Sequence, residues 1–503
     1  MTETIAKAPM PSEASPVSAG ASRIEVLVDR FNPILVKETR QALRGKAFRA
    51  GYLIVLLSTC MVGLIVLANS SFQGSDDSLG KSYFMALYGP ACVGLCAFLP
   101  IACFHSMSAE WEGSTHDLLA LTELTPAKIL RGKLATALVQ GILFASASAP
   151  FLALVPLMPG ISLVNAGFLL ALLPIASGSL CCMSLAIAAH SKSLGNRGFV
   201  LGGVALISLV AAWLMVMLAG FTVERSSVDT EQFVAIGLVA LFVGLAGAYL
   251  ALTALGPLGH PEENVSTPVR VFLTGTTLTA LVIMIVTQAL VFSPLYSPLA
   301  GICFALLSGS FVPFLGLVTE RQGLGRRTAL RVAEAKTSTL AAPWLPGPDR
   351  GLLLAFILGL PVALLPWAYA LLADQDPIVE PGISIVMFVY LMAYLSIAPL
   401  ILKSWCKTTV GRWRARALVV ASGVFAVLLP QIADAFAGRH LPEAFFLGDP
   451  FHSAGNLGDP NKTATVLGVC AIALFLIPVV ARSAARGYAE VSQARRATPK
   501  ENR

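Results

Sequence analysis

Long apolar runs alternate with short polar segments along almost the whole chain. Each run has about 20 residues, which is enough to cross the ~30 Å hydrocarbon core of a bilayer as a helix. The runs are too long and too continuous for the ~10-residue alternating strands of a membrane barrel. The predicted spans are residues 51–69, 83–104, 134–157, 163–189, 199–222, 233–255, 271–292, 298–318, 351–373, 382–402, 417–437 and 464–481.

Composition supports this pattern. The chain has 503 residues, of which 56% are apolar and only 13% are charged. Soluble proteins carry about 25% charged residues. Because lipid offers no hydrogen-bond partners, each spanning segment must satisfy its backbone internally, as a helix does. We therefore predict an all-α polytopic membrane protein with about twelve transmembrane helices, located in the cell's inner (cytoplasmic) membrane.

The distribution of basic residues predicts the orientation of the chain. With the N-terminus in the cytoplasm, twelve spans return the C-terminus to the same side. The segments then assigned to the cytoplasm hold 31 of the 35 lysines and arginines, as the positive-inside rule requires. The net charge of +7 therefore indicates contact with the lipid bilayer and its anionic headgroups, and not with nucleic acid.

The spans form two groups of six, between which we find no convincing sequence repeat. The predicted regions are a flexible tail at 1–20, a cytoplasmic interfacial helix at 21–50, a six-helix membrane domain at 51–255, a connector at 256–270, a second six-helix membrane region at 271–481 and a basic cytoplasmic tail at 482–503.

An amphipathic helix is predicted just before the first span. An Asn-Pro pair at residues 32–33 is typical of a helix start, with Asn as the cap and Pro in the first turn. Three basic residues then recur at spacings of three and four and share one face. Such a helix can lie along the cytoplasmic face of the membrane, although an ordinary juxtamembrane anchor explains the stripe equally well. The expected interface residues are Phe31, Pro33, Lys37, Arg40 and Arg44.

A polar stretch, EWEGSTHDLLALTELTPAKILRGK, lies between the second and third spans at residues 110–133. Ser114 and Asp117 have capping-box spacing, which predicts a short helix. Thr125-Pro126 predicts a second helix that continues into the third span. Acids at one end and leucines in the middle suit the groove of a partner protein, while a solvated or lipid-facing loop is the alternative. The expected docking residues are Glu110, Glu112, Thr115, Asp117, Leu118 and Leu119.

The sequence offers no catalytic, cofactor or metal site of its own. The stretch GSDDSLGKS at residues 74–82 has five residues where a phosphate loop has four. Cys92 and Cys96 lie one helical turn apart, and a soft-metal site there is conceivable, but small apolar packing residues explain them better. The predicted spans hold almost no charged residues, whereas ion-coupled carriers usually need them.

Two stretches together resemble the type-2 exporter family of ATP-binding-cassette (ABC) permeases. One is NPILVKETRQALRGKAF at residues 32–48, which resembles the interfacial helix before the family's first span. The other is the loop at 110–133, with its acids, leucine cluster, Thr-Pro pair and final Gly-Lys. Trp111, Ser114 and Glu123 depart from the family pattern, as does the second group of six spans.

The resemblance implies a membrane subunit without its own ATPase. A separate ABC subunit would bind ATP, dock on the loop and couple ATP hydrolysis to substrate translocation. The family works with two membrane domains. A homodimer or a paired membrane subunit is expected, and the alternative is that one chain supplies both halves. The alternatives are a non-transporting scaffold that anchors a partner complex, a secondary carrier, or an intramembrane enzyme. The transported substrate is not indicated by the sequence.

Overall fold

The structure is a computed structural model that describes only part of the chain. The residues described are 33–70, 78–112, 125–155, 160–191, 197–224, 230–259, 264–290, 299–320, 324–335, 338–372, 380–401, 408–437, 446, 449–450, 453 and 463–496. Regular structure within these ranges is helical throughout, without a strand. The chain is an all-α polytopic membrane protein, as predicted.

The helices of the first half begin with a short one that precedes the first predicted span. They are α2 (Pro33–Arg44), α3 (Lys46–Ser70), α4 (Ser78–Cys92), the π-helix η1 (Val93–Phe98), α5 (Leu99–Glu112), α7 (Pro126–Leu152), α8 (Leu163–His190), α9 (Arg197–Glu224) and α10 (Thr230–Leu258). The predicted start of α7 is confirmed, since the Thr125 hydroxyl accepts a hydrogen bond from the Lys128 N–H at 3.4 Å.

The second half contains two short helical elements between its long helices. Its elements are α11 (Ser266–Leu290), α12 (Leu299–Val318), α13 (Arg326–Glu334), the 3₁₀-helix η4 (Thr339–Trp344), α14 (Pro348–Leu372), α15 (Glu380–Ile401), α16 (Thr409–Ala437) and α18 (Thr463–Arg496).

Eleven helical segments among the described residues are long and apolar enough to cross a membrane. Eleven of the twelve predicted spans fall on these segments, the second of them on the continuous α4–η1–α5 segment Gly80–Trp111. The remaining one, at 382–402, falls on α15, whose apolar stretch Gly382–Ile397 is shorter. The cytoplasmic placement of both termini and the predicted region boundaries stay predictions.

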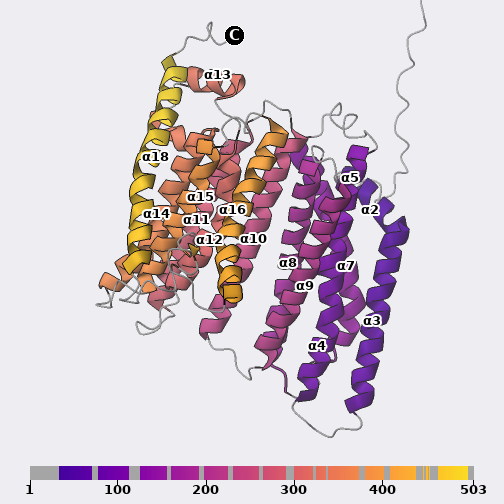
Figure 1. The fold of residues 1–503 in the computed structure, drawn as a ribbon. Coiled ribbons are helices and arrows are strands. Elements are labelled where there is room, and N and C mark those ends of the chain that lie inside the picture. Colours follow the sequence, from indigo (N-terminus) through magenta and orange to yellow (C-terminus); the bar gives the residue numbers. More distant parts are fainter. Residues whose placement is uncertain are drawn as a thin grey trace, which may run out of the picture.

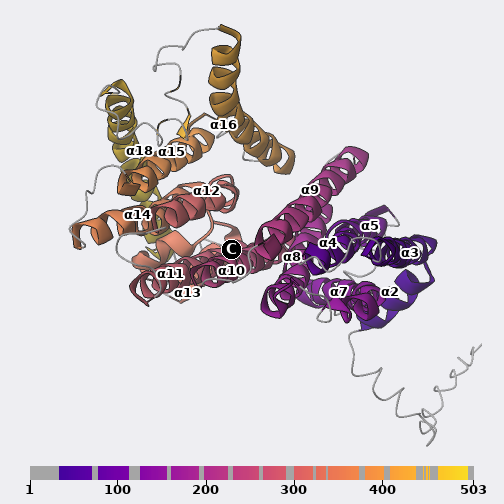
Figure 2. The ribbon, with the colours of Figure 1, turned by 90° about the horizontal axis from the view of Figure 1, so that it is seen from below.

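The long helices form two bundles that lie side by side (Figures 1 and 2). The helices α3 to α9 enclose one buried apolar cluster, and α11 to α18 enclose another. The connecting helix α10 contributes to both, with Ala254 and Leu258 in the first cluster and Tyr249 in the second. The Tyr249 hydroxyl also donates a hydrogen bond to the Pro313 carbonyl of α12, at 3.4 Å. The two halves therefore share a packed seam along α10.

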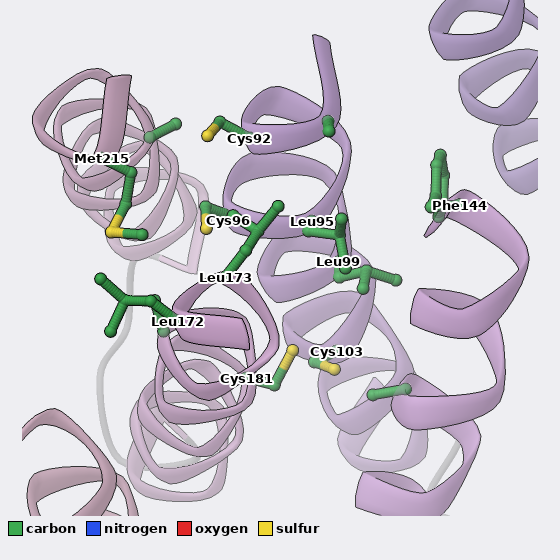
Figure 3. Packing of buried hydrophobic residues seen from close by; sticks show 14 of the residues in the cluster. Cys92, Leu95, Cys96, Leu99, Cys103, Phe144, Leu172, Leu173, Cys181 and Met215 are labelled. Atoms are coloured by element: carbon green, nitrogen blue, oxygen red, sulfur yellow. The ribbon is translucent and has the colours of Figure 1, made fainter. Parts of the chain in front are cut away.

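Buried cysteines fill part of the core of the first bundle (Figure 3). The side chains of Cys103 on α5 and Cys181 on α8 lie next to one another, while Cys92 and Cys96 face the side of α9 that carries Met215. Among the described residues, no group of three or more His, Cys, Asp or Glu side chains is placed to hold a metal ion. These thiols pack as small apolar groups among leucines.

The helices α12 and α14 approach closely at Gly351. A Cβ atom added there would lie 2.7 Å from the backbone carbonyl oxygen of Leu317, which cannot move without shifting its helix. We expect Gly351→Ala to lower the free energy of unfolding by about 1–3 kcal/mol, the usual range for overpacking. The matched control is Gly275→Ala on α11, where no atom lies within 4 Å of the added Cβ. Melting in detergent checks this, and equal melting temperatures for the two variants would contradict the close packing.

Candidate functional site at the ends of the bundles

The predicted docking residues fall at the edge of the described structure. Thr115, Asp117, Leu118 and Leu119 lie outside the described residues, and Glu112 ends α5 without a described side chain. Both flanks of their loop are described, since α5 leads into it and α7 leads out of it. The site can therefore be built from the residues that hold the two ends of the loop.

A buried lysine joins these flanks to α2. The Lys133 ammonium on α7 lies 2.9 Å from a carboxylate oxygen of Glu110 on α5 and 3.0 Å from one of Glu38 on α2. It also donates to the hydroxyl and the carbonyl of Ser106, at 2.8 and 3.1 Å. The Ser106 hydroxyl in turn donates to Glu38, at 2.9 Å. We call these four residues the Lys133 cluster.

The Lys133 cluster is shielded from solvent. The Lys133 side chain is 1% exposed, and those of Glu110 and Glu38 are 9% and 13% exposed. A buried ammonium is tolerated only when it is paired and hydrogen-bonded. Here the N–H groups of Lys133 donate to two carboxylates and to Ser106. Removal of one partner from such a group is strongly destabilising. The cluster therefore holds α2, α5 and α7 together where the loop begins and ends.

Glu110 faces inward, which does not fit the docking role predicted for it from the sequence. The sequence suggested that this carboxylate meets a partner protein, but it faces the bundle interior and pairs with Lys133. The physical reason is that Lys133 lies two helical turns inside α7, where it needs a counter-charge. We therefore reassign Glu110 from the docking surface to the Lys133 cluster, which leaves the rest of the predicted docking set on the loop.

The helix α2 packs on the bundle through one face. Ile34 is buried, and the Thr39 and Thr136 hydroxyls form a hydrogen bond of 3.4 Å between α2 and α7. Three of the predicted interface residues, Lys37, Arg40 and Arg44, are exposed on α2. Phe31 lies outside the described residues, and Pro33 begins the helix without a described side chain. The contact of this basic stripe with the membrane stays a prediction.

A second buried cluster lies in the other bundle, at the end that corresponds to the position of the Lys133 cluster. Arg270 on α11 is fully buried and pairs with Glu320, which follows α12, at 2.7 Å. Its guanidinium also donates to the carbonyls of Pro343 and Gly347, at 2.7 and 2.9 Å. Glu320 further accepts hydrogen bonds from the Ser266 hydroxyl and the Gly347 N–H, at 2.6 and 3.0 Å. We call this set the Arg270 cluster.

A further ion pair extends the Arg270 cluster to α18. The Arg350 guanidinium at the start of α14 is 2.8 Å from the Glu490 carboxylate, and it also donates to the Pro346 carbonyl. Gly347 has a φ of 142°, a conformation that favours glycine. The Pro-rich stretch at 343–351 is therefore held by hydrogen bonds and ion pairs, which join η4 and the start of α14 to α11, α12 and α18.

Sequence reasoning did not find Glu38, Ser106, Arg270, Glu320, Arg350 or Glu490, and it did not predict that Lys133 is buried. One available signal was position, because Lys133, Arg270 and Arg350 all lie within the first eight residues of long apolar helices. A charge so close to an apolar helix is costly without a partner. The partners themselves are far away in the sequence and come together only in the fold.

In both clusters every carboxylate is engaged by a cation or by hydrogen-bond donors. Both clusters join the ends of spanning helices to the segments between them. A displacement of such a segment would be transmitted to several spans at once. The chain matches no family model, no curated protein and no solved structure in the comparisons made.

Proposed function

We propose that this chain is the membrane-spanning permease subunit of an ABC exporter in the cytoplasmic membrane. A separate subunit binds and hydrolyses ATP and docks on the loop at residues 113–124. The observation that carries this proposal is the Lys133 cluster, which ties both flanks of that loop to α2 through bonds of 2.8–3.1 Å. The family resemblance of the loop and of α2 supports it from the sequence.

The cluster supports a mechanism in which the loop acts as a lever. Closure of the ATP-binding subunits on ATP displaces the loop, and the end of α5 moves with it. Because Lys133 bonds α5, α7 and α2 together, the second and third spans move with the interfacial helix as one unit. Contacts of α8 with α5 and with the adjoining η1 extend this motion into the bundle. One of them is the hydrogen bond from the Ser177 hydroxyl of α8 to the Leu95 carbonyl of η1, at 2.7 Å.

The test is a charge reversal in the loop that spares the Lys133 cluster. We expect Glu112→Lys with Asp117→Lys to lower the amount of ATP-binding subunit that copurifies with the chain at least tenfold. Such a loss corresponds to about 1.4 kcal/mol, well within the cost of reversing charges at an interface. The matched control reverses two acids of the connector, Glu262→Lys and Glu263→Lys, and should copurify normally.

Equal recovery of the ATP-binding subunit with both double variants would overturn docking at this loop. Substrate-stimulated ATP hydrolysis in the reconstituted complex then separates an exporter from a scaffold. A scaffold would bind the subunit through the same loop and show no stimulation with any substrate.

A further inference from the structure

The helix α13 occupies the same place in the second half that the docking loop occupies in the first. It lies in the segment between α12 and α14, the second and third spanning helices of the second half, just as the loop lies between α5 and α7. Figure 1 shows α13 across the end of α18, beyond the ends of α14 and α15 and at the same end of the molecule as α2. Its nine residues are amphipathic, with Thr328 and Val332 buried.

A small apolar core of its own holds α13 on α18. Val332 packs with Val491 of α18 and with Ala342 and Leu345 of the η4 segment. The Leu324 N–H, just before α13, donates to the Glu490 carboxylate at 3.0 Å, and the other oxygen of that carboxylate binds Arg350. The helix α13 is therefore coupled directly to α18, through Glu490 to α14 and through η4 to α11. A force applied to α13 would reach three spans, as a force on the first loop reaches α5 and α7.

The outer surface of α13 is strongly basic. Its exposed arginines, which we call the basic platform, are Arg326, Arg327 and Arg331. On α13 itself the one exposed acid is Glu334. Without the buried Glu110, the first loop carries three acids and neither lysine nor arginine from position 111 to 127. The two halves thus have sequences of opposite charge at corresponding places.

An anionic protein surface fits the platform better than a lipid surface does. A helix that lies in the membrane interface keeps an apolar face for the acyl chains. The apolar face of α13 is already buried against α18 through Val332, and its outward residues are Arg326, Arg327, Arg331 and Glu334. The helix α18 is 34 residues long, about 51 Å at 1.5 Å per residue, so its end extends beyond a ~30 Å hydrocarbon core.

We propose that the basic platform is a second docking surface for an ATP-binding subunit, one that presents acidic side chains to it. This inference rests on the proposed function. One chain then supplies both membrane halves of the exporter and receives two ATP-binding subunits, one at the acidic loop and one at the basic platform. Because the two surfaces have opposite charge, the two subunits meet them with different side chains, as two distinct ATP-binding proteins would.

The experiment counts ATP-binding subunits per chain after purification from native membranes. The test variant carries Arg326→Glu, Arg327→Glu and Arg331→Glu, and the matched control carries Lys at the same three positions. We expect two subunits on the wild-type chain and on the lysine variant, and one on the glutamate variant. All three changes are at exposed positions, so the variants should share one melting temperature in detergent, which separates lost docking from lost folding.

Two subunits retained on the glutamate variant, or a single subunit on the wild-type chain, would overturn the second docking surface and leave the proposed function intact. Absence of any ATP-binding subunit from the wild-type chain would overturn both. A further experiment measures how the wild-type chain and the glutamate variant bind vesicles that contain anionic phospholipid. If the glutamate variant loses binding of anionic lipid while it keeps both subunits, the platform is a lipid surface and the inference is wrong.

Discussion

Replacement of Lys133 by Met is expected to lower the free energy of unfolding by about 3–5 kcal/mol, the range for breaking a buried ion pair from one side. The variant leaves the Glu38 and Glu110 carboxylates facing one another in a buried site that no longer holds a cation. Their side chains are only 13% and 9% exposed, so bulk water solvates these charges poorly. Denaturant unfolding in detergent micelles, or a fall in melting temperature, measures the loss.

Two comparisons make this prediction specific to the buried cluster. Lys128→Met removes an exposed lysine from the same helix and should change stability by less than about 1 kcal/mol. Adding Glu38→Gln and Glu110→Gln to the Lys133 variant removes the unpaired charges and should recover part of the lost stability. If Lys133→Met is as stable as Lys128→Met, the carboxylates are not held as the structure shows.

Replacement of Arg270 by Met is expected to have an effect of similar size, about 3–5 kcal/mol. It leaves Glu320 without the cation that pairs with it. It also removes the guanidinium that donates hydrogen bonds to the Pro343 and Gly347 carbonyls. Because these groups fix η4 and the start of α14, the segment at 320–350 should also become accessible to protease. Limited proteolysis followed by mass spectrometry locates the new cleavage sites.

The conservative variant sharpens the second prediction. Lysine carries the charge but lacks the planar guanidinium fork that serves a carboxylate and two carbonyls together. Arg270→Lys should therefore lose part of the stability and still show cleavage in the segment. Arg495→Met removes an exposed arginine at the end of α18 and should show neither effect. An uncleaved segment in Arg270→Met would contradict the role given to the Arg270 cluster.

The spanning helices could be predicted from sequence because lipid imposes a simple rule on length and apolarity. The start of α7 could be predicted as well, since the Thr125 cap depends on residues within one turn. The buried ion pairs could not. Lys133 and Glu38 are 95 positions apart, and Arg350 and Glu490 are 140 apart. No local pattern relates such positions, so only the packing of the helices identifies the partners.

The helix α13 was missed for a related reason. Its sequence, RRTALRVAE, is too short and too polar to form a stable helix on its own. It forms here because Val332 and Leu324 pack on α18, an element that lies more than 150 positions later. The same tertiary contact holds α13 on the bundle, with its arginines on a surface that a partner could recognise.

The recovery of ATP hydrolysis with the purified chain tests the central claim most directly. The proposed function assigns the hydrolysis to a separate subunit. We predict that the chain, purified from its native membranes in mild detergent, elutes with an ATP-hydrolysing protein, and that the Glu112→Lys and Asp117→Lys double variant elutes without it. A well-folded wild-type chain that elutes with no ATP-hydrolysing partner would contradict the account.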